Sequence, residues 1–97
     1  MDICMDESGA IAINGEMVIS EIDILYTGIE ELIEKASRNI VLDLSKVDEI
    51  DASGLQLLFA LHKTIRETGT MNIRAVSTRV KEILALSGFD ILLKEAL

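Results

Sequence analysis

The side chain best placed for chemistry in this sequence is the hydroxyl of Ser53. It lies in the polar stretch 48–55, between an apolar run that predicts a strand at 39–45 and an amphipathic run that predicts a helix at 53–68. This order places Ser53 at the N-terminus of the helix, where backbone N–H groups are free and the positive end of the helix dipole points outward. A phosphoryl group on Ser53 is expected to meet hydrogen-bond donors there.

The same spacing also has a purely structural interpretation. Ser53 and Gln56 have the Ser-x-x-Gln spacing of a capping box, in which the hydroxyl accepts a backbone N–H and the Gln side chain reaches back. On this interpretation Ser53 only starts the helix, and spacing alone favours it because polar residues are common at helix starts. Asp51 is expected to steady the turn by accepting backbone N–H groups ahead of Ser53.

The predicted helix from Ser53 divides into two faces at about 100° per residue. The face expected to pack on the sheet carries Leu55, Leu58, Leu61, His62 and Ile65, and the opposite face carries Ser53, Gln56, Ala60, Lys63, Thr64 and Glu67. Ser53 is therefore expected to face solvent. Leu57 flanks the polar face, where it either anchors a partner or packs at the edge of the core. His62 is expected to be a packed histidine rather than a base or ligand.

Composition and charge limit the classes of function. The 97 residues are 49% hydrophobic, which suits one domain over 1–97. A net charge of −8 argues against nucleic acid or an anionic membrane surface as a direct partner and favours a basic protein surface. Cys4, the only cysteine, is expected to pack as a small hydrophobe. Since no signal peptide and no apolar run of about 20 residues is found, a cytoplasmic location without a membrane span is expected.

The remaining elements alternate along the chain. A hairpin is predicted from strands at 2–5 and 10–14, followed by a helix from residue 22 to 36 and a strand at 40–44 that is expected to be covered on both faces. A strand at 71–76 and a helix with Thr78 as its expected N-cap and a stop at Gly88 complete the pattern, and residues 89–97 fit either a strand or a helix. The predicted fold is α/β: a mixed, mostly parallel sheet of four or five strands with an N-terminal hairpin and helices packed on it.

The residues Asp51-Ala52-Ser53-Gly54-Leu55, placed after the predicted strand, resemble the signature region of the STAS domain family, the fold of anti-sigma factor antagonists. The similarity extends to residues 15–20 and to the helix ending near Gly88, and so spans nearly the whole chain. It implies that Ser53, just before Gly54, is phosphorylated by a partner kinase that is often also the anti-sigma factor. Many members have a second hydroxyl residue where this chain has Ala52, which leaves one acceptor in the turn.

The resemblance implies a phosphorylation-controlled interaction module that performs no catalysis and needs no cofactor or metal. The unmodified protein is expected to bind a kinase-type anti-sigma factor, and a phosphatase is expected to restore that state. Phosphate on Ser53, close to the carboxylate of Asp51, is expected to release the partner through repulsion and desolvation. The predicted partner-binding residues are Asp48, Ser53, Gln56, Leu57 and Ala60, with Asp51 and Gly54 supporting the turn.

Three alternatives stay open. Similar stand-alone STAS domains act as subunits of lipid-transport ATPase complexes or in chemotaxis and stress-signalling modules, and on this alternative the protein works without phosphorylation of the hydroxyl. A carrier protein also has Asp two residues before a modified Ser at a helix start, but carrier domains are all-helical and the strands at 40–44 and 71–76 argue against this class. Last, a catalytic or cation site can be drawn from Asp43, Asp48, Glu49 and Asp51 or from His62, although turn chemistry explains Asp48 and Asp51.

Overall fold

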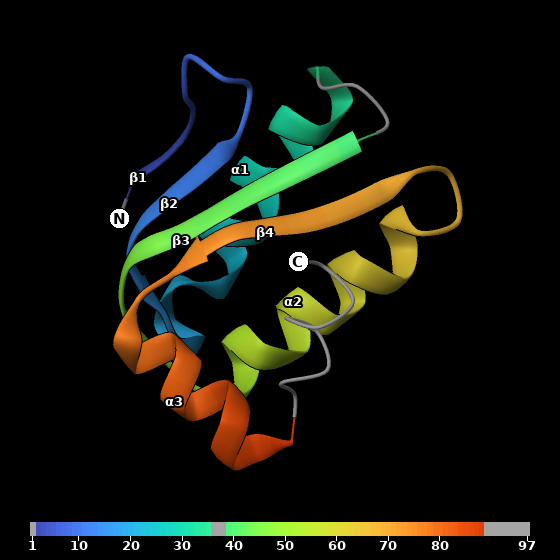
Figure 1. The fold of residues 1–97 in the computed structure, drawn as a ribbon. Coiled ribbons are helices and arrows are strands. Elements are labelled where there is room, and N and C mark those ends of the chain that lie inside the picture. The colour runs from blue at the N-terminus through green and yellow to red at the C-terminus, as the bar shows by residue number, and fades with distance from the viewer. Residues whose placement is uncertain (1, 36–38, 89–97) are drawn as a thin grey trace.

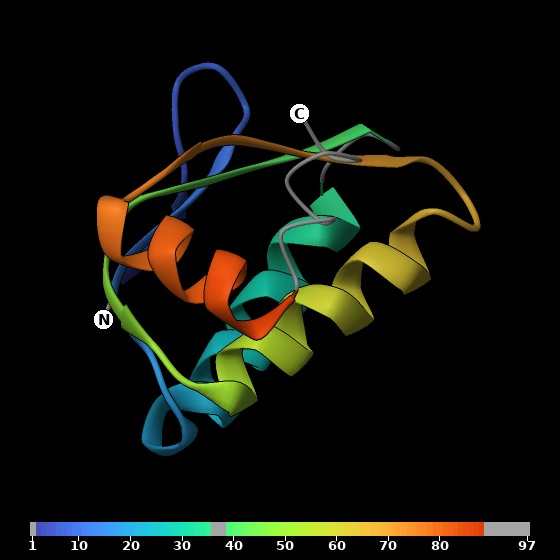
Figure 2. The same cartoon turned by 60° about the horizontal axis from the view of Figure 1, so that its bottom comes forward.

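The computed structural model describes residues 2–35 and 39–88, which form a sheet covered by helices on one face (Figures 1 and 2). In chain order the elements are β1 (Asp2–Met5), β2 (Ile11–Met17), the short 3-10 helix η1 (Ile19–Glu21), α1 (Ile22–Lys35), β3 (Asn39–Ile50), α2 (Ala52–Ile65), β4 (Thr70–Val76) and α3 (Thr78–Ser87). The strand order is β1-β2-β3-β4, in which β1 and β2 are antiparallel and the other two pairs are parallel. The predicted α/β fold with a mixed, mostly parallel sheet is confirmed, and the residues considered for a fifth strand lie outside the described ranges.

Within the described ranges the helices cover one face of the central strand β3, and its side chains alternate between buried and less buried positions, so the prediction that its apolar run is covered on both faces is wrong for this part of the chain. Ile40, Leu42 and Leu44 are buried against the helices, whereas Asp43 and Ser45 lie on the opposite face. Alternate side chains of a strand point to opposite faces, and all the helices of the described ranges lie on the same side of the sheet (Figure 2). The strand also continues to Ile50, past Asp48 where the predicted turn was to begin, because β2 pairs with it as far as Met17 and Ile50.

The core between the sheet and the helices takes buried side chains from every helix except η1. They are Leu25 and Ile29 from α1, Leu55, Leu57, Leu58 and Ile65 from α2, and Val80 and Leu84 from α3. His62 is buried with them, as the helical pattern predicts. Within the described ranges no helix is both long and apolar enough to cross a lipid bilayer.

Two local predictions need correction. Cys4 is exposed rather than packed, because its neighbours Ile3 and Met5 on the edge strand β1 take the inward positions. The N-cap of α3 is Ser77 and not Thr78: the Ser77 hydroxyl accepts the Val80 N–H at 3.2 Å and donates to the Val47 carbonyl at 2.7 Å. This second bond ties the start of α3 to β3, a tertiary contact that the sequence pattern does not contain.

The face of the sheet opposite the helices carries a small ionic network centred on Arg74 of β4. Its guanidinium lies 2.7 Å from a carboxylate oxygen of Asp6 and 2.5 Å from one of Asp43, and so joins the β1–β2 turn to β3 and β4. The hydrogen bond from Arg74, followed by those from Ser45, lowers the pKa of Asp43 to about 2. The network therefore stabilises the folded chain at neutral pH and loses that contribution in acid.

Candidate functional site

Asp51, between β3 and α2, is the N-cap of α2. Its backbone is extended (φ −113°, ψ −172°), and one carboxylate oxygen accepts the N–H groups of Ser53 at 2.9 Å and Gly54 at 3.2 Å. The capping-box interpretation of Ser53 is therefore wrong. Since α2 begins at Ala52, Ser53 is the second residue of the helix, past the position from which a side chain caps the first turn.

Asp51 also joins two chain segments that are distant in sequence. Its second carboxylate oxygen accepts the Ile19 N–H of η1 at 3.0 Å, and its own N–H donates to the Met17 carbonyl at 3.2 Å. Met17 and Ile50 pair at the carboxyl ends of the parallel strands β2 and β3, so the site forms at that edge of the sheet. Desolvation by itself raises the pKa of Asp51, but hydrogen bonds from backbone N–H groups outweigh it and hold the pKa below its ordinary value. The carboxylate is therefore charged at neutral pH.

Gly54 permits the close contact between the first turn of α2 and the end of β2. A Cβ atom built on Gly54 overlaps the Met17 carbonyl oxygen and lies 2.7 Å from the Ile50 Cγ1 atom. Any side chain at this position therefore has to push α2 away from the sheet edge. Gly54, directly after Ser53, thus allows the first turn of α2 to lie close to the sheet edge and sets how far Ser53 is buried.

Ser53 is half-buried rather than fully exposed, and its hydroxyl oxygen still reaches solvent. Every solvent-inaccessible side-chain nitrogen or oxygen of the described ranges has a hydrogen-bond partner, whereas the Ser53 hydroxyl has none within those ranges. Most of the N–H groups expected to be free around it are not free: Asp51 takes those of Ser53 and Gly54 through its side chain and that of Leu55 through its carbonyl at 3.0 Å. A phosphate on Ser53 would thus lie close to a carboxylate that already accepts two of these N–H groups.

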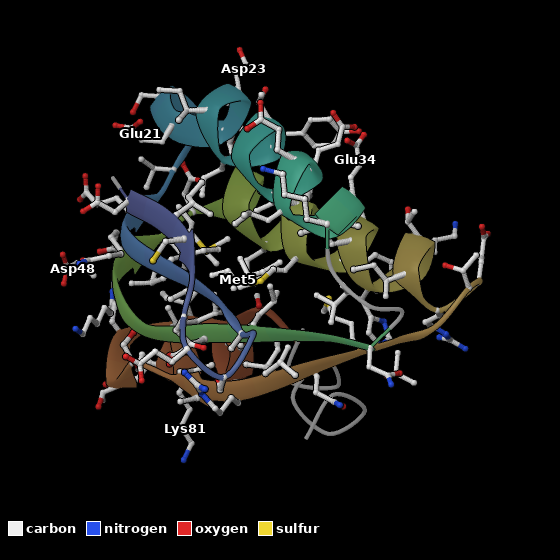
Figure 3. All side chains as sticks on the ribbon, turned by 90° about the horizontal axis from the view of Figure 1, so that it is seen from above. Met5, Glu21, Asp23, Glu34, Asp48 and Lys81 are labelled. Carbon is white, nitrogen blue, oxygen red and sulfur yellow. The ribbon has the colours of Figure 1, made fainter. Side chains whose placement is uncertain are left out.

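The other predicted partner-binding residues divide into two groups. Asp48, Gln56 and Ala60 are exposed, and Figure 3 shows Asp48 pointing away from the body of the molecule. Leu57 is 7% exposed, so of its two interpretations the structure favours packing at the edge of the core, away from the exposed surface around Ser53. It packs because α1 lies beside α2, and a count of helical angles on α2 alone does not contain that neighbour.

The acidic residues near Ser53 do not converge. Asp43 pairs with Arg74 on the far face of the sheet, Glu49 binds Arg79 at 3.0 Å, and Asp51 caps α2. The hydrogen bond from Arg79, together with that from the Ile50 N–H, lowers the pKa of Glu49. Within residues 2–35 and 39–88 no cluster of His, Cys, Asp or Glu is suited to hold a metal ion. The acid–base or cation interpretation of these four residues is therefore wrong, and the sheet rules out the all-helical carrier-protein class.

Sequence reasoning missed Ile19. It is apolar yet 71% exposed, and its backbone N–H is bound by the Asp51 carboxylate, so it lies beside the turn that carries Ser53. An exposed apolar side chain next to an accessible hydroxyl suits a protein partner. The sequence contains one signal for it: β2, parallel to β3, must end at the same edge of the sheet, so the residues after β2 lie near Ser53. This signal does not say which of their side chains stays outside the core.

Comparison with known proteins finds a relative by sequence. The chain is 31% identical over 58 residues to a Bordetella bronchiseptica protein named as an anti-sigma factor antagonist, BtrV. The alignment covers 59% of this chain and 50% of the relative, so the chain spans about half of the relative's length.

Two solved structures have a similar fold. One is an anti-sigma factor antagonist from Mycobacterium paratuberculosis, with a TM-score of 0.76, 19% identity and coverage of 92% of this chain and 77% of the other. The second is the anti-sigma factor antagonist SpoIIAA in its unphosphorylated form, with a TM-score of 0.73, 17% identity and coverage of 99% and 86%. At these identities the likeness concerns the fold.

The family is established by a match along nearly the whole chain. The family described as "Mlab, STAS domain" matches residues 5–94, a range that includes strands β2 to β4, the helices and the Asp51–Gly54 turn. The resemblance drawn from the sequence is confirmed, and the protein belongs to the STAS domain family.

Proposed function

We propose that this protein is a phosphorylation-controlled interaction module of the anti-sigma factor antagonist type, with Ser53 as the modified residue. The observation that carries the proposal is the solvent-open Ser53 hydroxyl in the first turn of α2, beside a carboxylate that already occupies the N–H donors. The unmodified protein binds a kinase-type anti-sigma factor, that kinase phosphorylates Ser53, and a phosphatase reverses the modification. The domain itself catalyses no reaction, and both enzymes act on it in the cytoplasm.

The electrostatics of the turn supply the switch. Phosphorylation adds about −1.5 to −2 charge at pH 7, next to an Asp51 side chain whose lowered pKa keeps it ionised. Because the carboxylate already takes the N–H groups of Ser53 and Gly54, they do not compensate the new charge. A partner docked there must therefore desolvate two anionic groups at once. A penalty of about 3 kcal/mol weakens binding more than about a hundredfold.

The surface around Ser53 supports a protein partner rather than a small ligand. Gln56 and Ala60 are exposed on the same side of α2, Asp48 extends the surface toward β3, and Ile19 adds an exposed apolar side chain. The relatives support the same direction, since BtrV and both structural neighbours carry the name anti-sigma factor antagonist. The SpoIIAA structure is described as an unphosphorylated form.

The test compares Ser53→Ala with Ser53→Asp. Asp51 caps α2 in both variants, so their free energies of unfolding should differ by less than about 0.5 kcal/mol. Each tagged variant is used to isolate bound proteins from the native host, and the affinity of the recovered partner is then measured with purified components. We expect Ser53→Ala to bind and Ser53→Asp to lose binding, and we expect phosphopeptide mapping of the unaltered protein to place phosphate on Ser53.

Thr78→Asp is the matched control, because it adds the same charge in the first turn of another helix, at an exposed position. It should bind as the unaltered protein does. Equal binding by Ser53→Asp and Ser53→Ala would contradict the switch and favour a STAS subunit that binds its complex without phosphorylation. If Thr78→Asp also lost binding, the effect of Ser53→Asp would be explained by net charge and not by the position of the new carboxylate.

A further inference from the structure

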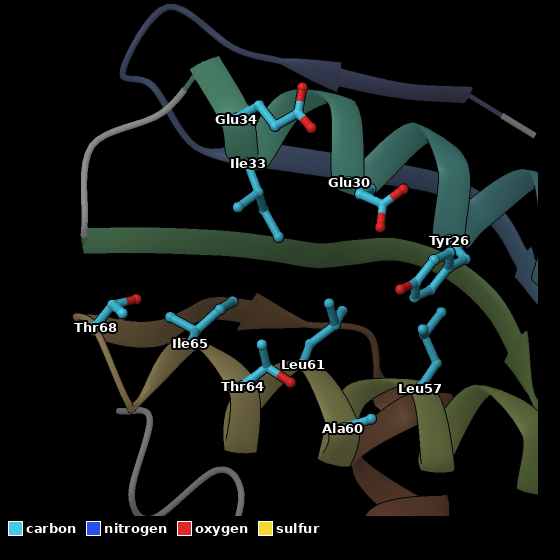
Figure 4. A pocket seen from close by; sticks show the side chains of 10 residues that line it. All are labelled: Tyr26, Glu30, Ile33, Glu34, Leu57, Ala60, Leu61, Thr64, Ile65 and Thr68. Carbon is cyan, nitrogen blue, oxygen red and sulfur yellow. The ribbon is translucent and has the colours of Figure 1, made fainter.

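An apolar groove runs between α1 and α2, on the side of α2 that carries Leu57. Its volume is about 330 Å³, and Ile33, Leu57, Leu61 and Ile65 form its floor (Figure 4). These floor residues are buried or half-buried, whereas Tyr26 above Leu57 is 51% exposed and offers an aromatic ring at the mouth. The groove begins one helical turn beyond Ser53 and does not include it.

The two rims of the groove differ in charge. The α1 rim carries Glu30 and Glu34, both exposed and one turn apart, and neither makes an ion pair with any residue of the described ranges. Like charges at this spacing destabilise a helix slightly, so these carboxylates do not serve α1 itself. The α2 rim consists of small or neutral residues, Ala60, Thr64 and Thr68. The groove thus combines an apolar floor with one acidic edge whose charges no described residue compensates.

We propose that this groove docks a basic amphipathic helix of a partner protein. The apolar side of such a helix packs on the floor of the groove, and its Lys or Arg residues reach Glu30 and Glu34. The small side chains of the α2 rim let the partner helix approach α2 closely. The same acidic edge disfavours two other occupants. A symmetric second copy would bring two sets of these glutamates together in a chain of net charge −8, and the headgroup of an anionic lipid would meet the same repulsion.

This proposal is independent of the Ser53 switch, because the groove is present in the unmodified protein and the switch does not require a groove. The probe is a synthetic 14-residue helical peptide with leucine at positions i, i+3, i+4 and i+7 and lysine elsewhere. Its affinity for the full chain is measured by fluorescence anisotropy at low ionic strength, and the binding surface is mapped by amide chemical shifts in NMR spectra.

The decisive comparison uses two double variants that remove the same charge from α1. Glu30→Gln with Glu34→Gln neutralises the groove rim, and Asp23→Asn with Glu31→Gln neutralises exposed carboxylates that line a different surface of the helix. Figure 3 shows Asp23 and Glu34 projecting outward from α1, and Glu30 and Glu31 are exposed as well. Both pairs therefore face solvent, and their substitution should leave the fold intact. We expect about tenfold weaker binding for the rim pair and less than about twofold for the control pair.

Blocking the groove gives a second readout. Ala60→Trp places a large side chain on the exposed α2 rim, and it should abolish shift changes at the floor residues. The proposal would be overturned if the two double variants weakened peptide binding equally or if the shift changes lay outside the groove. Binding would then depend on overall charge alone. Self-association through the groove, measured by sedimentation at the same concentrations, would overturn it in favour of a second copy.

Discussion

Gly54→Ala tests the claim that close approach of α2 to the sheet edge positions Ser53. The new Cβ would overlap the Met17 carbonyl oxygen and lie 2.7 Å from the Ile50 Cγ1 atom. Neither group yields easily, since the Met17 carbonyl also accepts the Asp51 N–H and the Ile50 side chain is buried. The first turn of α2 must therefore move outward and carry the serine with it.

Two opposing terms set the size of the effect. Alanine is favoured over glycine in a helix by up to about 1 kcal/mol, whereas overpacking a tight contact costs about 1–3 kcal/mol and more when backbone must move. We expect Gly54→Ala to be destabilised by about 1–3 kcal/mol net. Gly28→Ala is the matched control on α1: its nearest atom is the Ile3 Cδ1 atom at 2.8 Å, the end of a flexible side chain. Its propensity gain should make it neutral or slightly stabilised.

Urea unfolding followed by circular dichroism measures both variants under the same conditions. A difference of about 2 kcal/mol between them corresponds to about 8–16 °C in the midpoint of thermal unfolding for a domain of this size. Gly54→Ala should also weaken binding of the partner recovered with Ser53→Ala, because the hydroxyl surface moves. Equal stability of Gly54→Ala and Gly28→Ala would refute the close-approach argument.

Two further predictions concern charged groups away from the hydroxyl. Asp51→Ala removes the acceptor of the N–H groups of Ile19, Ser53 and Gly54. We expect it to lower the free energy of unfolding, measured in urea, by about 2–4 kcal/mol, which is more than Asp51→Asn should. A loss below about 0.5 kcal/mol would contradict the role of Asp51 in joining η1 to α2. Asp43 has a pKa of about 2 in the folded state against about 3.9 in an unfolded chain, so its pairing with Arg74 stabilises above about pH 4 and is lost as the pH falls toward 2. Arg74→Gln should therefore lower the urea midpoint at pH 7 and lower it less near pH 2, where Asp43 is partly protonated. Some effect remains at pH 2 because hydrogen bonds from Ser8 and Arg74 hold the pKa of Asp6 well below its usual range, so the pair of Arg74 with Asp6 persists. The exposed control Lys81→Gln should have little effect at either pH.

The predictions from sequence succeeded where the signal is local and periodic. The apolar positions of α2, the αL stop at Gly88 (φ 81°) and the strand–turn–helix order around Ser53 all follow from residue spacing, and the fold class follows from the alternation of elements. They failed by one or two residues at helix starts, where Asp51 and Ser77 hold the cap positions instead of Ser53 and Thr78. Each of these caps also bonds to a distant segment, and that contact is what distinguishes it from its neighbour.

The sequence by itself determined the alternation of strands and helices, the position of Ser53 at the start of α2 and the acidic charge, because each depends on residue type and spacing along one segment. The tertiary structure decided which groups around Ser53 remain available: Asp51 takes the N–H donors, Ile19 lies exposed beside the turn, and Leu57 turns into the groove against α1. The physical reason is that burial and hydrogen-bond partners depend on segments that meet only when parallel strands align their carboxyl ends and two helices pack side by side. A helical wheel describes one helix, and the neighbour that covers one of its faces is set by the rest of the chain.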